Sequence, residues 1–172
     1  LVGHTKLLGD FVVYTAGNFR GGDKVFQLRN AYMSFRNVTV GYNYGGFRDL
    51  AALPSTIDFQ GPNGATFYRA TQLAYTYKGL KNWRFHASIE VPSVDGATND
   101  ELSVAQQRMP DFTAYAQYGW GANSHLRVGG IVRSMTYTST LSNHASDVTG
   151  WGIQASTSFN LSKKWEIFGQ AT

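Results

Sequence analysis

The sequence contains no cysteine and only four prolines among its 172 residues. The absence of cysteine excludes disulfides, iron–sulfur clusters and cysteine-based zinc sites. Long apolar runs are also missing, because nowhere do about 18 consecutive apolar residues occur, the length that a transmembrane helix needs. A membrane protein built from strands is compatible with these absences, since each strand of a membrane barrel shows only one face to lipid.

Charge is sparse as well. Fifteen Lys and Arg stand against 11 Asp and Glu, and no basic run is longer than Lys163 and Lys164. This diffuse excess predicts no nucleic-acid partner. What the sequence has in abundance is aromatic residues, at 15%, and glycine, at 19 positions. Aromatic and β-branched residues mixed with Thr, Ser, Asn and Gln are typical of half-buried strands.

Strand-like alternation recurs along the chain and predicts about ten strands. In residues 83–91 the odd positions are aromatic or aliphatic, while the even positions are Arg84, His86, Ser88 and Glu90. Successive side chains of a strand point to opposite sides, so one face is apolar and the other is polar. The same pattern occurs in residues 38–44, 112–120 and 151–161.

The predicted links alternate between short and long. Short links are expected around residues 8–10, 36–37, 79–82, 121–124 and 162–164. Longer links are expected around residues 20–24, 45–65, 93–109 and 139–148. This parity is typical of an up-and-down barrel in a membrane, with tight periplasmic turns at one rim and long loops at the other.

We therefore expect an all-β fold, a transmembrane antiparallel up-and-down β-barrel of the porin type. The chain begins and ends within strand-like sequence, without an initiator methionine, a signal peptide or a terminal aromatic residue. We interpret residues 1–172 as an internal part of a single porin β-barrel domain, with about ten strands of a barrel of about 16. The expected location is the bacterial outer membrane, with outer-membrane lipid or lipopolysaccharide as a partner.

Aromatic residues lie at or near the predicted strand ends, at Tyr77, Trp83, Tyr118, Trp120, Trp151 and Trp165. Trp and Tyr favour the membrane–water interface, where the ring is half buried and its polar atom stays wet. They therefore predict an aromatic girdle. In a soluble protein the same residues would close the core at the strand ends, and the sequence leaves that alternative open.

The link at about residues 45–65 is the most individual part of the sequence. Links longer than about 12 to 15 residues without regular structure are usually functional or disordered. Its apolar residues predict a packed loop with a short helix near residues 48–53. The loop either folds into the barrel and narrows the pore or packs outside the lumen. The candidate constriction residues are Arg48, Asp49, Asp58, Phe59 and Asn63.

Residues 53–64 read LPSTIDFQGPNG and precede a strand at residues 72–76, and residues 28–32 read LRNAY. The first segment resembles the LP-x-T-x-DF-E-GPNG stretch of the DcaP-like porins, and the second resembles their LRHAY segment. The resemblance is specific over about residues 28–92, and Gln60 stands where the family has an acid. It implies a trimeric outer-membrane porin that is linked to dicarboxylates and other small anions.

Strand parity places six candidate pore-lining residues on the polar faces: Arg29, Arg84, His86, Glu90, Arg127 and Arg133. Basic side chains attract anions more strongly in a narrow pore than in bulk water. The predicted function is a passive diffusion channel for small, dicarboxylate-like anionic solutes. Alternatively, these residues form salt-bridge ladders with acids such as Asp49 and Asp58 and leave little net field. Both arrangements can coexist.

The sequence predicts no catalytic site, no cofactor and no metal site. Ser88 lies two residues from both His86 and Glu90 on one strand, a separation of roughly 7 Å that prevents direct proton transfer. The four histidines show no metal-binding spacing. We therefore do not expect an enzyme. The competing interpretation is a soluble or secreted all-β binding protein, such as an adhesin or a carbohydrate-binding module, because alternation alone fits a soluble sandwich too.

Overall fold

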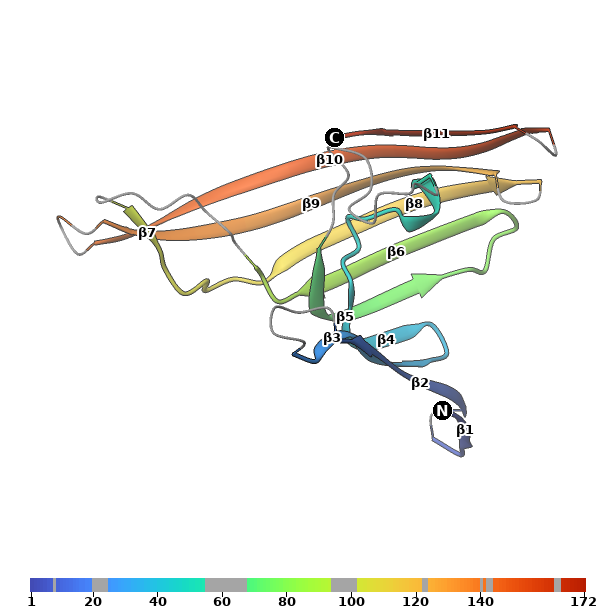
Figure 1. Ribbon diagram of the computed structural model, residues 1–172, viewed down its shortest axis with the longest axis horizontal. Helices are drawn as coiled ribbons and strands as arrows, with labels where there is room; N and C mark the ends of the chain where they lie inside the picture. The colour runs from blue at the N-terminus through green and yellow to red at the C-terminus, as the bar shows by residue number, and fades with distance from the viewer. Residues whose placement is uncertain are drawn as a thin grey trace.

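The computed structural model describes residues 1–7, 9–19, 25–54, 68–93, 102–121, 124–139, 141, 144–162 and 165–172. Within them the chain forms one antiparallel sheet of eleven strands (Figure 1). The strands are β1 (Val2–Thr5), β2 (Gly9–Asn18), β3 (Gln27–Phe35), β4 (Val38–Tyr44), β5 (Arg69–Tyr77), β6 (Trp83–Glu90), β7 (Leu102–Val104), β8 (Asp111–Trp120), β9 (Ser124–Ser139), β10 (Ala145–Ser162) and β11 (Trp165–Ala171). A 3-10 helix, η2 (Leu50–Ala52), lies in the link between β4 and β5.

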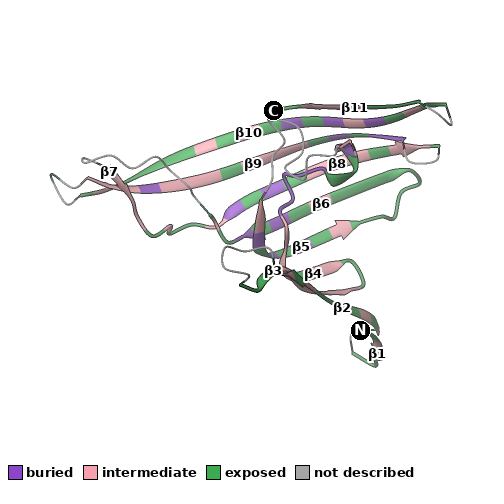
Figure 2. Ribbon diagram, in the orientation of Figure 1, coloured by how far each residue is buried: buried purple, intermediate pink, exposed green. Residues whose placement is uncertain are grey.

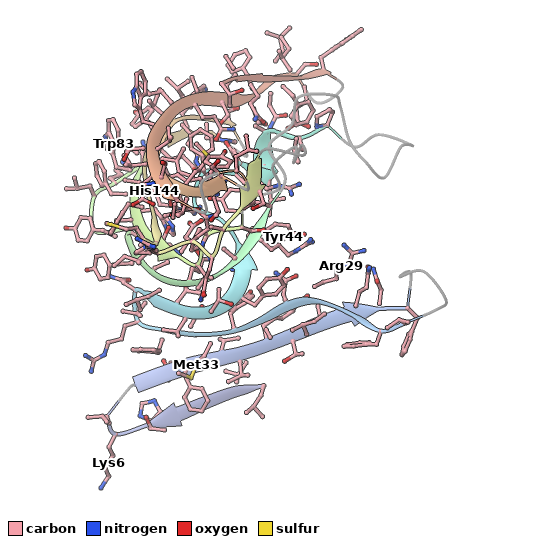
Figure 3. All side chains as sticks on the ribbon, turned by 90° about the vertical axis from the view of Figure 1, so that its left-hand side faces the viewer. Lys6, Arg29, Met33, Tyr44, Trp83 and His144 are labelled. Carbon is pink, nitrogen blue, oxygen red and sulfur yellow. The ribbon has the colours of Figure 1, made fainter. Side chains whose placement is uncertain are left out.

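The topology is up-and-down. Each strand pairs with the next along the chain, apart from the short β7, which pairs with β9 beyond the end of β8. β1 and β11 form the two edges of the sheet. Viewed along the strands, the sheet curls into an arc (Figure 3). The predicted all-β, antiparallel, up-and-down architecture is confirmed, with eleven strands in the described residues. None of the described helical residues belongs to a helix long and apolar enough to cross a membrane.

Tight turns connect the strands at one end of the sheet, and three of their residues have a left-handed backbone conformation. Arg36, in the two-residue link from β3 to β4, has a positive φ of 52°, and Asn82, before β6, has 68°. Gly121, after β8, has 63°. Asn and Gly adopt this left-handed conformation at little cost, and single residues of other types do so in turns.

Two predicted long links differ from the structure. The link at residues 93–109 contains the short strand β7. Residues 139–148 were expected to form a long link, but the link covers only residues 140–144. β9 and β10 stay paired up to the Ala145 and Thr138 register, and Ser139 N–H donates to the carbonyl of His144 at 3.0 Å. Backbone hydrogen bonding therefore continues farther than the side-chain pattern indicated. These two strands project beyond their neighbours at the end where β7 lies (Figure 1).

The two faces of the sheet are inverted relative to a water-soluble protein. On β5 and β6, Leu73 and Ile89 are 53% and 46% exposed, whereas Ser88 and Glu90 are 5% and 1% exposed. Burial alternates with exposure along β5 and over the second half of β6, and Figure 2 shows the same alternation along β10. On β5 and β6 the exposed apolar side chains lie on the convex face and the buried polar ones on the concave face. A soluble sandwich needs a second sheet over the apolar face, and the described residues form one sheet only.

Aromatic side chains gather at the rim formed by the short turns. The rings of Trp83 and Phe85 stack with their centroids 5.6 Å apart, and Trp83 also contacts Tyr118 at 5.1 Å. Tyr118 in turn stacks on Trp120 at 6.0 Å. Figure 3 shows Trp83 on the outer side of the arc. Trp151, which was expected near a strand end, lies well inside β10, because that strand begins at Ala145.

Candidate functional site

The candidate site consists of the concave wall and of residues 45–54, which leave β4 and lie against it. Register builds the wall in rows: Glu90 on β6 faces Asp111 on β8, and Ser88 faces Thr113 in the next row. Because side chains of one parity share a face, polar residues from β5, β6, β8, β9 and β10 meet on one surface. Figure 3 shows Tyr44, at the start of the loop, on the inner side of the arc.

The loop first touches the wall at Gly46. Its N–H donates to Oε1 of Glu90 at 2.6 Å, and its carbonyl accepts a hydrogen bond from the guanidinium of Arg127. A Cβ at this position would overlap Oγ1 of Thr113 and lie 2.9 Å from Oγ of Ser88. Glycine is therefore required here, because only a residue without a side chain lets the backbone come this close.

Glu90 is a buried carboxylate that joins the two ends of the loop. Besides the N–H of Gly46, it accepts hydrogen bonds from Oγ of Ser88 at 2.6 Å and Oγ1 of Thr113 at 3.0 Å. The fourth donor is the hydroxyl of Tyr68, at 2.5 Å, directly before β5. Gly45 N–H also donates to the carbonyl of Tyr68 at 3.3 Å. A buried charge is tolerated when such donors replace its water.

Asp49 attaches the loop to the wall a second time, at β9 and β10. One carboxylate oxygen lies 2.7 Å from Nε2 of His125 and accepts a hydrogen bond from Oγ of Ser156 at 2.6 Å. The other oxygen accepts from the N–H of Ala51 at 3.1 Å, which caps η2, and lies 3.9 Å from Nη1 of Arg127. Burial alone would raise the pKa of Asp49, but the hydrogen bonds from Ser156 and His125 and the nearby Arg127 charge hold this pKa below its usual value.

An apolar contact supports the same attachment. Phe47 is 9% exposed and packs beside Gly152, where a Cβ would lie 3.4 Å from the Phe47 ring and 3.3 Å from Cγ2 of Ile131. Ile131 faces Thr113 across the β8–β9 ladder and so belongs to the inner wall. Phe47 therefore packs against a small apolar area, formed by Gly152 and Ile131, in an otherwise polar surface.

Two of the predicted pore-lining residues pack together on the wall. The guanidinium of Arg127 lies 3.5 Å from the centroid of the Tyr115 ring, and the ring of His86 stacks on Tyr115 at 4.7 Å. Nδ1 of His86 is 2.9 Å from Oγ1 of Thr76. Arg127 and His86 are thus held by the wall and the loop.

Arg133 is compensated by a buried acid. Its Nε and Nη2 donate to Oδ2 of Asp111 at 3.0 and 2.6 Å, and Asp111 is fully buried. The salt-bridge arrangement expected as an alternative therefore exists for this arginine, and in a looser form for Arg127 with Asp49.

Arg84 and Arg29 differ from these arginines. Arg84 is exposed and shares an inner row with Gln117 and Arg127. Among the described residues no acidic side chain forms an ion pair with it. Arg29 is half-buried and lies where the β2–β3 register shifts. Its Nε and Nη2 lie 3.0 Å and 3.2 Å from the side-chain amide oxygen of Asn18.

The remaining loop residues are only partly described. Arg48 is buried, with its guanidinium 4.9 Å from the centroid of the Tyr44 ring. Burial lowers its pKa to about 10, an effect that Tyr44 partly offsets. The other three candidate constriction residues, Asp58, Phe59 and Asn63, lie outside the described residues.

Sequence reasoning missed several residues of the site: Gly46, Tyr68, His125 and Ser156, which hold the loop, and Asp111, which pairs with Arg133. Strand parity indicates that Ser156 is on the polar face, but it cannot show that Ser156 reaches Asp49, 107 positions away. His125 lies 76 positions from Asp49 and lacked a chemical signal beyond being a histidine.

The expectation that residues two apart on one strand are too distant for direct contact is wrong for Ser88 and Glu90, because their side chains lie on one face and reach each other at 2.6 Å. Ser88 donates to Glu90, while His86 interacts with Thr76 through Nδ1. Within the described part of the chain, no three His, Cys, Asp or Glu side chains gather in a way that could hold a metal ion.

Comparison with known proteins bears on the fold. No protein-family model matches the chain, and no curated protein matches it. Among solved structures, the chain is similar to the outer membrane channel DcaP of Acinetobacter baumannii, with a TM-score of 0.70 and 24% sequence identity. The match covers 90% of this chain and 43% of that chain, so the chain spans less than half of the channel's length. The predicted resemblance to DcaP-like porins is thus confirmed at the level of the fold, which is that of part of an outer-membrane channel barrel.

Proposed function

We propose that the chain is part of an outer-membrane porin, a passive diffusion channel whose pore runs along the concave face. The observation that carries this proposal is the inversion of the two faces. Ile153 is 60% exposed on the convex face, while Ser156, on the same strand, is 2% exposed on the concave face. Soluble proteins bury the opposite set of residues, whereas a barrel in lipid turns its apolar side chains outward. The fold shared with an outer-membrane channel supports the same function.

The surroundings follow from this placement. The convex face contacts outer-membrane lipid or lipopolysaccharide. The aromatic cluster around Trp83 lies at the membrane–water interface on the side of the short turns. The edges of β1 and β11 are unpaired within the described residues. Open strand edges do not occur in the hydrocarbon region, so further strands of a barrel of about 16 pair with them. The resemblance to trimeric porins supports a homotrimer.

The loop at about residues 45–65 narrows the pore. Its first part crosses from the end of β4 to His125 on β9 and Ser156 on β10, which lie several strands away around the arc. A segment attached at both places must pass through the concavity. Arg48 and Asp49 belong to this crossing, and Asp58, Phe59 and Asn63 follow it in the sequence.

The solutes are small anions, and the preference for them is mild. Arg84 is exposed on the concave face without an acidic partner among the described residues, and Arg29 lies beside a neutral amide. Arg127 and Arg133 lie near carboxylates that offset their charge. An uncompensated cation in a narrow pore attracts carboxylates, while pore water and salt screen it.

Planar-bilayer recording of the full-length protein tests the function. We expect ohmic single-channel steps and a reversal potential, in a potassium chloride gradient, that indicates chloride preference. Deleting residues 49–60 should raise the conductance, because the crossing segment is lost. A purified protein that stays folded and soluble without detergent and gives no steps would contradict the channel. A cation-selective reversal potential would contradict the anion assignment alone.

A further inference from the structure

We propose that Glu90 is a positioning residue. Its carboxylate is hydrogen-bonded to both ends of the loop, an arrangement that we call the clasp, and so keeps the loop in one position and the pore at one width. The inference rests on the proposed channel function. The neck consists of Gly46, where the loop leaves the wall, and Tyr68, where it returns to β5. The N–H of Gly46 donates to Oε1 of Glu90 at 2.6 Å, and the hydroxyl of Tyr68 donates to Oε2 at 2.5 Å.

The chemistry of the clasp requires a carboxylate. Glu90 receives hydrogen bonds from the Gly46 N–H, from the Tyr68 hydroxyl and from the paired hydroxyls of Ser88 and Thr113, which also contact each other at 2.5 Å. An ionised carboxylate is an acceptor only and has room for all of these donors. Glutamine has nearly the same shape but is neutral and carries an NH2 group in place of one oxygen. It loses the charge-assisted hydrogen bonds, and its NH2 group next to Tyr68 would make the Tyr68 hydroxyl accept instead of donate.

The clasp acts at a different place from the Asp49 attachment. Asp49 holds the far end of the crossing segment on β9 and β10, and Glu90 holds its base on β6. Arg127 also holds the base, through the Gly46 carbonyl. Loss of the Glu90 contacts therefore weakens the base and allows it to move while Asp49 still holds the far end. Each charge-assisted hydrogen bond lost at the base should raise the population of displaced loops roughly tenfold or more.

The first test replaces Glu90→Gln in the full-length protein. We expect more open-channel noise and additional conductance levels than in the wild type. The matched control is Glu166→Gln on β11, which removes the same charge from a side chain that accepts a hydrogen bond from Oγ of Ser158 at 2.8 Å. The control should keep the wild-type noise. Equal noise in both variants would show that Glu90 contributes charge alone and would overturn the proposal.

A charge-neutral change tests the same clasp if Glu90→Gln does not fold. In Gly46→Ala the added methyl group would overlap Oγ1 of Thr113 and displace the neck from the wall. This variant should show the same extra noise with an unchanged reversal potential. A folded Gly46→Ala channel as quiet as the wild type would overturn the proposal.

A chemical readout separates the clasp from the channel function. The chain has no cysteine, and Ala52 in η2 is 3% exposed, so Ala52→Cys places one shielded thiol on the loop. A water-soluble thiol reagent should label it faster when Glu90→Gln is added, and no faster when Glu166→Gln is added. Equal labelling rates would overturn the clasp even in a conducting protein. Faster labelling in a protein that does not conduct would uphold the clasp and reject the channel.

Discussion

The two faces of the same strands differ in how specific their contacts are. On the convex face of β10, Ile153 and Leu161 are 60% and 64% exposed. On the concave face of the same strand, Ser156 is 2% exposed and is hydrogen-bonded to Asp49. The outer face therefore depends on the surrounding medium, whereas the inner face depends on individual partners. Substitutions on the two faces should fail for different physical reasons.

The largest expected effect is a charge on the outer face at mid-strand. Ile153→Arg should cost about 2 to 4 kcal/mol of folding free energy in a lipid bilayer, because the guanidinium is then placed in hydrocarbon. Leu161→Arg, near the end of the same strand and on the same face, should cost about 0 to 1 kcal/mol, because it lies close to the interface. Urea titrations in vesicles measure both values, and equal costs at the two depths would contradict the membrane orientation.

The next effect concerns a buried partner on the inner face. Asp49→Asn should cost about 1.5 to 3 kcal/mol, because charge-assisted hydrogen bonds are weakened and Arg127 and His125 lose their anion. Asp10→Asn is the matched control, since Asp10 also contacts a histidine, His4, at 2.7 Å, but its side chain is 91% exposed. Exposed pairs contribute little, so Asp10→Asn should be nearly neutral. A cost for Asp10→Asn as large as that for Asp49→Asn would break the comparison between buried and exposed pairs.

The same carboxylate predicts a pH dependence. The pKa of Asp49 is lowered from its usual 3.8, so its folded state binds the proton less readily than its unfolded state. Its contribution to stability is therefore fully present above pH 3.8 and is lost as pH falls through the lower, folded-state pKa. Wild type should exceed Asp49→Asn in stability by no less at about pH 4 than at pH 7, and the difference should shrink only below that. A difference that shrinks between pH 7 and 5 would contradict the assignment.

The smallest expected effect is a change in ion selectivity, and it distinguishes two arginines on the concave face of the sheet. Arg84→Gln should shift the reversal potential away from anions by a modest amount, because Arg84 is exposed and pore water screens its charge. Arg133→Gln should mainly destabilise the fold, because it leaves Asp111 buried without its cation. Reversal potentials and urea midpoints of both variants provide the measurement. A larger selectivity change for Arg133→Gln than for Arg84→Gln would contradict this division.

The sequence by itself determined the strands and their two faces. Alternation at residues 83–91 correctly predicted which side chains of β6 face inward, and the short links at residues 36–37 and 79–82 are turns at one rim. These features depend on a period of two residues and on local turn chemistry, which neighbours in the sequence decide. Strand length was less predictable, because β9 and β10 continue through backbone pairing that side chains do not reveal.

Only the tertiary structure decided what the inward side chains do. Arg84, Arg127 and Arg133 look alike in the sequence, yet one is exposed, one binds the loop and one binds Asp111. Likewise, parity placed Glu90 on the polar face without indicating that it joins Gly46 to Tyr68. These contacts arise because the curvature of the sheet brings distant strands around one concavity and the loop crosses it. Strand periodicity fixes the side of the sheet on which a residue lies, and the path of the chain through space selects its partner.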